Sequence, residues 1–209
     1  MHTATLPRPA VTLLAGLAAA LTVLTALTVL TLSLPARAQV NAGPYVPSPD
    51  SAVAEMLKMA GITPKDFVID LGSGNGFPGV CIAAMHPGAS VVLMDKTGKK
   101  VRAIGTCLMT AKFDAVETVH MDAAQAPALR VDLRHAFDVV AARAVGKPEV
   151  VAELAESLVR PGGHLVLWLD DDANAPEQLG TFRREQLLPY DLPEPAARRR
   201  VLGCWKKRQ

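Results

Sequence analysis

Three closely spaced glycines follow a short apolar stretch of this chain: Gly72, Gly74 and Gly76 come just after Phe67–Leu71. The stretch has the length and composition of a strand buried on both faces, and only Asp70 interrupts it. Glycine permits positive φ and lets the backbone approach a ligand closely. A helix that begins behind such a turn offers free N–H groups and a partial positive charge. The pattern therefore indicates a ligand-binding turn that follows a buried carboxylate.

The spacing of the glycines bears on which ligand they hold. A turn that binds the pyrophosphate of a dinucleotide reads G-x-G-x-x-G, whereas this one reads G-x-G-x-G. A nicotinamide-dependent enzyme is therefore disfavoured. The plain alternative is a glycine turn that binds nothing.

Other polar residues follow later apolar stretches. Asp95 ends the stretch that begins at Ser90, and a carboxylate in that position can accept hydrogen bonds from both hydroxyls of a ribose. Asp122 follows a third stretch and Arg143 a fourth. Because parallel strands end at one edge of their sheet, we expect these side chains to gather there with Asp70.

Alternating strands and helices must position these residues. Strands are expected at 67–71, 90–95, 116–121, 137–141 and 164–169, and helices at 51–60, 80–85, 98–112 and 148–158. This alternation predicts an α/β fold with a Rossmann-like, doubly wound sheet. A polar helix at 175–184 and two antiparallel strands near 186–190 and 200–206 are expected to complete a sheet of seven strands.

The turn, D-L-G-S-G-N-G at residues 70–76, resembles motif I of the class I S-adenosylmethionine-dependent methyltransferases. From Asp70 onward the chain resembles the small-subunit ribosomal RNA guanine-N7 methyltransferases, the glucose-inhibited division protein B family. The residues that carry this resemblance are Gly76-Phe77-Pro78-Gly79, Gly98-Lys99-Lys100-Val101-Arg102, Arg143-Ala144, Leu192-Pro193 and Arg200-Val201-Leu202. The resemblance implies S-adenosyl-L-methionine as the cofactor and a class I methyltransferase fold.

The resemblance also implies roles for single residues. Asp70 organises the turn and the ammonium group of the cofactor, and Asp95 binds the ribose. Arg143 lies near the methyl donor and is the one candidate catalytic residue, with a surface ion pair as its plain alternative. The full set of expected cofactor-binding residues is Asp70, Gly72, Ser73, Gly74, Gly76, Phe77, Asp95, Asp122, Ala123, Ala124 and Arg143. No metal site is expected.

The methyl acceptor is left open between an RNA base and a protein side chain. Where the family tends to carry Lys-Gly after the fifth strand, this chain has an acidic loop, Leu169–Asp172, which should repel phosphates. Residues 1–76 resemble exported or anchored bacterial proteins that are similar to the mitochondrial lysine methyltransferases. That second resemblance rests on Tyr45-Val46-Pro47-Ser48-Pro49, the helix after it and the glycine turn.

The N-terminal segment predicts a location. Residues 10–34 carry no charge and form a run of about 25 residues, long enough to span a bilayer, and Ala36-x-Ala38 resembles a signal-peptide cleavage site. We therefore expect a signal peptide or membrane anchor at 1–39, a linker at 40–50 and the methyltransferase domain at 51–209. The expected location is exported, periplasmic or anchored in the inner membrane, with a cytoplasmic domain if the segment is an N-out anchor.

Composition narrows the function only a little. The formal net charge is +2 over 209 residues, which gives no bulk electrostatic case for nucleic acid. The three cysteines match neither a zinc motif nor a disulfide framework. Because S-adenosylmethionine is made in the cytoplasm, an exported domain suggests a further alternative, a relic of the fold that binds a nucleoside without activity.

Overall fold

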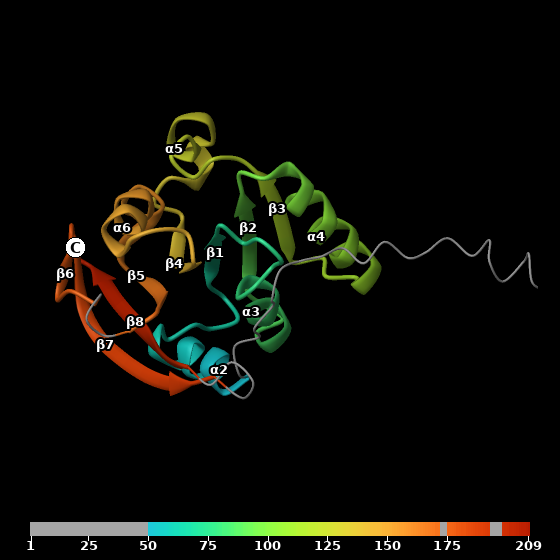
Figure 1. Cartoon of the computed structure of the whole chain (residues 1–209). Coiled ribbons are helices and arrows are strands. Elements are labelled where there is room, and N and C mark those ends of the chain that lie inside the picture. Colours follow the sequence, from blue (N-terminus) through green and yellow to red (C-terminus); the bar gives the residue numbers. More distant parts are fainter. Residues whose placement is uncertain (1–49, 172–174, 193–197) are drawn as a thin grey trace, which may run out of the picture. The chain divides into compact units, whose positions relative to one another are not determined.

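One mixed sheet organises the chain (Figure 1). The computed structural model describes residues 50–171, 175–192 and 198–209. Within them the strands run in the order β3-β2-β1-β4-β5-β8-β7-β6. The predicted signal or anchor segment and linker, at residues 1–49, lie outside the described residues.

The first five strands are parallel to one another. They are β1 (Phe67–Leu71), β2 (Ser90–Asp95), β3 (Val116–His120), β4 (Phe137–Arg143) and β5 (Val159–Leu169). In the register of the sheet, Leu71 at the end of β1 lies beside Met94 of β2 and Ala142 of β4. The carboxyl ends of β1, β2 and β4 are therefore level, as the sequence predicted.

Helices cover both faces of this parallel part. The helices α2 (Asp50–Met59), α3 (Gly79–Met85) and α4 (Gly98–Ala111) pack on one face, where Met56, Ile82 and Ile104 are buried against the sheet. The short α5 (Ala126–Leu129), the 3₁₀ turn η1 (Val131–Leu133) and α6 (Pro148–Glu156) pack on the other. This doubly wound arrangement confirms the predicted fold class.

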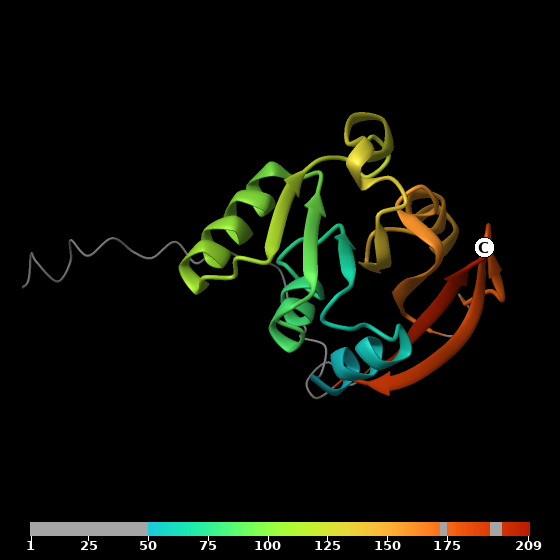
Figure 2. The same cartoon turned by 180° about the vertical axis from the view of Figure 1, so that it is seen from behind.

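The remaining strands are antiparallel: β6 (Gln178–Leu179), β7 (Phe182–Asp191) and β8 (Arg199–Lys207). Seen from behind, β7 and β8 form a long curved pair at one edge of the molecule (Figure 2). The helix predicted at 175–184 is wrong, because a tight hairpin pairs Leu179 with Phe182. Gly180 turns that hairpin with a φ of +58°. The described residues thus hold eight strands rather than seven.

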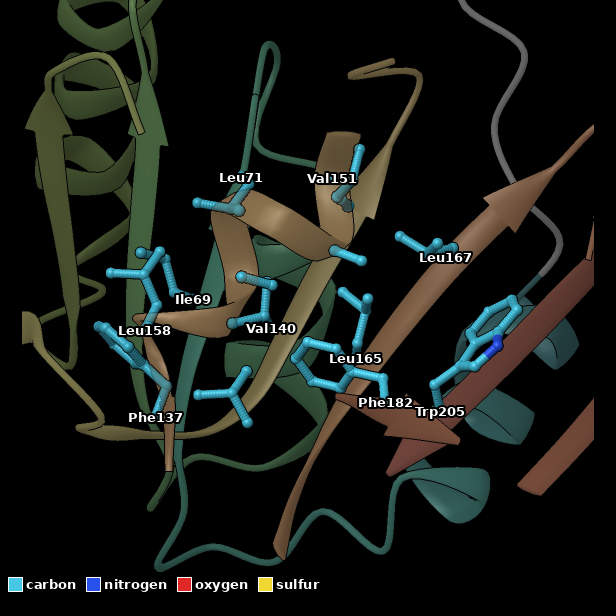
Figure 3. Packing of buried hydrophobic residues seen from close by; sticks show 14 of the residues in the cluster. Ile69, Leu71, Phe137, Val140, Val151, Leu158, Leu165, Leu167, Phe182 and Trp205 are labelled. Atoms are coloured by element: carbon cyan, nitrogen blue, oxygen red, sulfur yellow. The ribbon is translucent and has the colours of Figure 1, made fainter. Parts of the chain in front are cut away.

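The core on the α6 side of the sheet is continuous from the parallel to the antiparallel strands (Figure 3). Phe137 and Leu165 come from the parallel strands, and Phe182 and Trp205 from the antiparallel ones. All four are fully buried. The indole N–H of Trp205 donates a hydrogen bond of 2.9 Å to the carbonyl of Pro176, so this large side chain leaves no polar atom unpaired. The antiparallel strands are therefore part of the same domain core.

Candidate active site

The glycine turn connects β1 to α3 and folds over the end of β2. Gly72, Gly74 and Gly76 all have positive φ, at +66°, +55° and +89°. The N–H groups of Gly72 and Ser73 donate to the carbonyl of Met94, at 2.8 and 3.1 Å. Residues with a side chain seldom adopt such φ values, so the sequence of glycines explains the shape of this turn.

Close packing adds a second reason for glycine. A Cβ at Gly72 would lie 2.6 Å from Cγ2 of Val145, which belongs to the loop after β4. A Cβ at Gly76 would lie 2.7 Å from Cγ2 of Val80 and would collide with Ile104 of α4. The turn is thus held between α3, α4 and the loop after β4.

Asp70 lies beneath the turn and is fully buried. Its Oδ2 accepts a hydrogen bond of 2.9 Å from the N–H of Gly79, the first residue of α3, whereas its Oδ1 is buried without a partner. Burial raises the pKa of Asp70 to about 7, with a smaller contribution from the charge of Asp95. The hydrogen bond from Gly79 and the charge of Arg143 oppose that rise. Asp70 therefore ties the turn to α3 and keeps one oxygen for another partner.

Asp95, at the end of β2, binds the glycine turn through its carboxylate. Its Oδ2 accepts a hydrogen bond of 3.0 Å from Gly74 N–H, and its Oδ1 accepts one of 2.7 Å from Thr97 N–H. Lys100 Nζ stands 4.0 Å from Oδ2. Burial would raise the pKa of Asp95, but these hydrogen bonds and the nearby Lys100 hold it below its usual value. The carboxylate is ionised at neutral pH, and each oxygen keeps a further lone pair.

Arg143, at the end of β4, contacts the residue that follows the glycine turn. Its Cζ stands 5.2 Å from the centroid of the Phe77 ring, a cation–π contact. Ala144, the next residue, has a φ of +56°, and Val145 packs on Gly72. Positive φ in a residue with a side chain is strained and often marks a functional loop. Val145 thus packs on Gly72, the first glycine of the turn, and Arg143 contacts Phe77, the residue after its last glycine.

The segment after β3 lies beside Asp95. Asp122 Oδ1 accepts a hydrogen bond of 3.0 Å from Ala124 N–H, and Met121 N–H donates to the carbonyl of Asp95 at 3.2 Å. Ala123 is half-buried against the core. Asp122 and Ala124 are exposed at the same edge of the sheet as Asp95.

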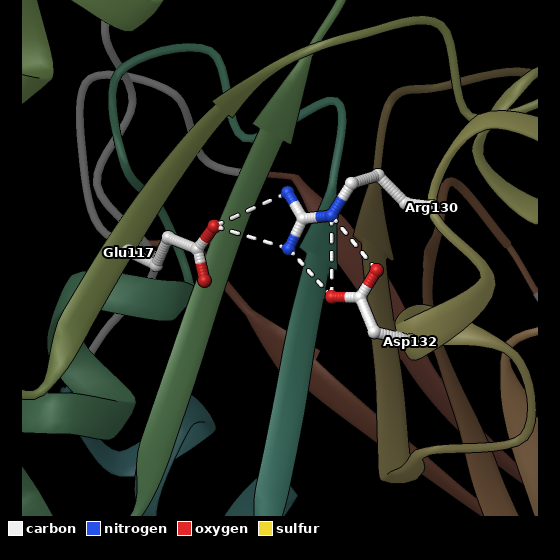
Figure 4. Close-up of polar contacts among 3 residues, drawn as sticks. All are labelled: Glu117, Arg130 and Asp132. Carbon is white, nitrogen blue, oxygen red and sulfur yellow. Dashed lines mark hydrogen bonds and ion pairs between the residues drawn. The ribbon is translucent and has the colours of Figure 1, made fainter.

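An ion network fixes the chain beyond this segment (Figure 4). Arg130 donates from Nη2 to Oδ2 of Asp132 at 2.7 Å, and its Nη1 reaches Oε1 of Glu117 on β3 at 3.4 Å. The pKa of Arg130 is raised and that of Asp132 is lowered, chiefly by their mutual hydrogen bonds. This network joins the turn after α5 to β3 and lies outside the candidate site.

The acidic loop after β5 is less repulsive to phosphate than the sequence indicated. Asp170 forms an ion pair with Arg200 of β8, so one of the negative charges of this loop is compensated. Exposed basic residues also follow β2, beside Asp95; they are Lys96, Lys99, Lys100 and Arg102. In the described ranges no group of three or more His, Cys, Asp or Glu side chains could hold a metal ion.

The structure brings the predicted residues together in two groups. Hydrogen bonds tie the glycine turn to β2 through Asp95 and the carbonyl of Met94, and tie Asp70, at the end of β1, to Gly79 at the start of α3. Arg143 contacts the ring of Phe77, which follows the last glycine of the turn. Asp122 to Ala124 lie beside Asp95, linked through Met121. Thr97 and Val145 also belong to the site and were not predicted from the sequence. The position of Thr97, directly after the strand-ending Asp95, could have revealed the first, whereas the contact of Val145 with Gly72 has no local signal.

The residues present fit an S-adenosyl group. The glycine turn gives close access to backbone N–H groups, the lone pairs of Asp95 suit two ribose hydroxyls, and Oδ1 of Asp70 is a buried acceptor without a partner. These features are the ones that a positively charged, ribose-containing ligand requires.

Comparison with known proteins decides the family. The family described as rRNA small subunit methyltransferase G (GidB) matches residues 50–182, which is more than half of the chain and contains every residue of the candidate site. The chain belongs to the GidB family. The resemblance predicted from motif I onward is therefore confirmed, and so, at the level of the family, are an enzyme and S-adenosylmethionine as its cofactor.

Curated GidB relatives support this membership. The protein from Lachnoclostridium phytofermentans named ribosomal RNA small subunit methyltransferase G is 28% identical over 160 residues, 73% of this chain and 65% of the relative. A protein of the same name from Prochlorococcus marinus is 33% identical over 130 residues, 60% of this chain and 53% of the relative. The chain thus spans less than two thirds of the length of these GidB relatives.

Solved structures confirm the class I methyltransferase fold. An RNA methyltransferase from Salinibacter ruber, in complex with S-adenosyl-L-homocysteine, has a TM-score of 0.58 and 22% identity. The match covers 78% of this chain and 95% of that one. TrmN from Thermus thermophilus has a TM-score of 0.61 and 17% identity, over 76% of this chain and 48% of that one.

GidB membership corrects the predicted location. Export or membrane anchoring conflicts with membership of a family whose matched members are named for the RNA of the small ribosomal subunit, and that prediction is wrong. None of the helices in the described residues is long and apolar enough to cross a membrane. The alternative of an inactive, nucleoside-binding relic of the fold is not supported either, because it depended on export of the domain. The resemblance of residues 1–76 to lysine methyltransferase-like proteins gives way to GidB from residue 50 onward.

Proposed function

We propose that this chain transfers the methyl group of S-adenosylmethionine to the RNA of the small ribosomal subunit, at N7 of a guanine. The observation that carries the proposal is that the GidB match at residues 50–182 includes Asp70, Asp95 and the glycine turn, which is hydrogen-bonded to Asp95 and followed by a helix whose first residue is bonded to Asp70. A protein acceptor has no such support.

The proposed cofactor contacts follow from the geometry of the site. Asp95 would bind the two ribose hydroxyls through its remaining lone pairs, and the backbone at Ala123 and Ala124 would contact the adenine. Oδ1 of Asp70 would meet the ammonium end, either directly or through water, because it is the buried acceptor without a partner. The glycine turn would lie against the methionine part, where no side chain keeps the backbone away.

The bound cofactor supplies an electrophilic methyl group on a sulfonium. Guanine N7 already has a lone pair, so the protein has no proton to remove before the methyl carbon–sulfur bond breaks. The work left to these residues is to align the acceptor and exclude water. Arg143, held over Phe77 by its cation–π contact, would line the space between turn and acceptor. A lysine acceptor would first have to lose a proton, which is a further reason to favour RNA.

The basic residues after β2 support an RNA acceptor. Lys96, Lys99 and Arg102 are exposed close to Asp95, at the edge where the acceptor must arrive. Cationic side chains in such a place neutralise phosphates and make binding dependent on salt. Although the whole chain is nearly neutral, the candidate site thus lies next to a local positive surface.

Incubation of the purified full chain with tritium-labelled S-adenosylmethionine and isolated small ribosomal subunits tests the proposal. We expect label that ribonuclease releases and protease does not, and strongly reduced label with Asp95→Ala. Label in the protein fraction, or none in either fraction with a folded wild-type protein that binds the cofactor, would overturn it.

A further inference from the structure

Trp168 lies next to Arg143 at the carboxyl edge of the sheet. In the parallel pairing of β4 with β5, Arg143 and Trp168 are register partners, and on its other side Trp168 pairs with Leu202 of β8. Partners in a parallel pair send their side chains to the same face. Trp168 and Phe77 also pack against the same layer of buried side chains, the one that α2, α3 and α4 cover. The indole, the guanidinium and the Phe77 ring therefore gather on one face at one edge.

The indole nitrogen of Trp168 is a hydrogen-bond donor without a partner. Nε1 is buried and makes no hydrogen bond, although the side chain as a whole is only half-buried. Trp205, the other tryptophan of the chain, donates from its Nε1 to Pro176. Buried indole N–H groups usually find an acceptor, and one that does not calls for an explanation. An absent ligand with a hydrogen-bond acceptor would explain it.

Resting on the proposed function, we propose that Trp168 recognises the methyl-acceptor base: its N–H donates to a ring-edge acceptor of a nucleobase that enters beside Arg143. The planar indole and guanidinium groups give the base surfaces on which to stack. The N–H adds what stacking alone lacks, a preference for a base with an acceptor in the right place. Because Nε1 is covered in the unliganded protein, entry of the base requires a local shift of the surrounding side chains.

The chain offers a matched pair of variants. Trp168→Phe keeps an aromatic ring on the same layer and removes only the N–H and part of the indole. We expect it to raise the KM for RNA by about tenfold, as the loss of a hydrogen bond inside a binding site does, with the Kd for S-adenosylhomocysteine changed by less than about twofold. Its Tm should be equal to or above that of the wild type, because an unpaired buried donor disappears.

Trp205→Phe is the control. It removes an indole N–H that is already satisfied, on the opposite face of the sheet. We expect a lower Tm and an unchanged KM for RNA, provided that the domain stays folded. It also leaves Trp168 as the single tryptophan of the chain. Its fluorescence should then change when small-subunit RNA is added in the presence of S-adenosylhomocysteine.

The outcomes separate the two proposals. If the wild type methylates RNA but Trp168→Phe has the wild-type KM, the role of Trp168 is refuted and the proposed function stands. A parallel loss of cofactor affinity in Trp168→Phe, or unchanged fluorescence in Trp205→Phe on addition of RNA, also refutes it. If the wild type methylates no RNA at all, both proposals fail.

Discussion

The amide of Gly74 donates a hydrogen bond of 3.0 Å to the carboxylate of Asp95, so the turn after β1 is fastened to the end of β2. Met121, after β3, donates in turn to the carbonyl of Asp95. One residue therefore joins three strand ends, and its ionised carboxylate faces the place proposed for the ribose. The consequences of this arrangement can be measured.

Asp95→Ala should weaken S-adenosylhomocysteine binding by at least about tenfold. The variant loses the two hydrogen bonds proposed from the ribose hydroxyls to the carboxylate, and the glycine turn loses its bond from Gly74 to Asp95. Isothermal titration calorimetry measures the Kd. Asp114→Ala, at an exposed position before β3, is the control and should bind like the wild type. Equal affinity of Asp95→Ala and the wild type would refute the ribose contact.

Asp70 should make stability depend on pH. Its pKa rises from 3.8 to about 7 on folding, so between these values the folded state holds a proton that the unfolded state has released. Stability must then fall as pH rises through this window, by about 1.4 kcal/mol per pH unit as an upper value, and level off above it. Urea unfolding of the wild type and Asp70→Asn at pH 5, 6, 7 and 8 measures this.

In Asp70→Asn the side chain keeps one carbonyl oxygen for the Gly79 N–H but cannot ionise. The free energy of unfolding of this variant should therefore lack the part of the pH dependence that Asp70 contributes. Parallel plots of unfolding free energy against pH for the wild type and Asp70→Asn would contradict a raised pKa of Asp70.

A ligand with an ammonium group should favour the ionised form of Asp70, so cofactor binding below pH 7 should release protons. Calorimetry in buffers of different ionisation enthalpy detects that release.

Gly76→Ala should destabilise the domain by about 1–3 kcal/mol, because the new Cβ meets Ile104 and Val80 and the φ of +89° is strained for alanine. Gly146→Ala is the matched control: no atom lies within 4 Å of its added Cβ, and a change within about 0.5 kcal/mol is expected. Chemical denaturation gives both values. Similar stability of the two variants would show that the turn tolerates a side chain.

Arg143→Lys keeps the charge and loses the planar group over Phe77. We expect kcat to fall about tenfold, equivalent to ~1.4 kcal/mol in the transition state, with little change in the Kd for S-adenosylhomocysteine. Arg160→Lys, which alters an exposed arginine paired with Asp138 near the start of β5, should leave kcat unchanged. If both Arg143→Lys and Arg143→Ala have the wild-type kcat, the proposed role of Arg143 near the methyl donor is refuted.

The parts of the site that the sequence predicted depend on local chemistry. A G-x-G-x-G turn can hardly be built without positive φ, and Asp95 stands where β2 must end, so residue type and position were enough. The same holds for the parallel strands, whose apolar runs are too short for helices.

The missed parts depend on distant partners. Residues 175–184 have the polarity of a surface helix, but Leu179 and Phe182 bury their side chains against the core, and Gly180 lets the chain reverse between them. Likewise, the charge of Asp170 could not be judged until β8 placed Arg200 beside it. Contacts between residues far apart in the chain decide such cases.

The most direct test of methyl transfer to guanine N7 is the identity of the modified nucleoside. Small-subunit RNA would be incubated with the wild-type protein and methyl-deuterated S-adenosylmethionine, digested to nucleosides and analysed by mass spectrometry. We predict deuterium in 7-methylguanosine, which Asp95→Ala should strongly reduce. Deuterium in another nucleoside, or in none, would contradict methylation at guanine N7.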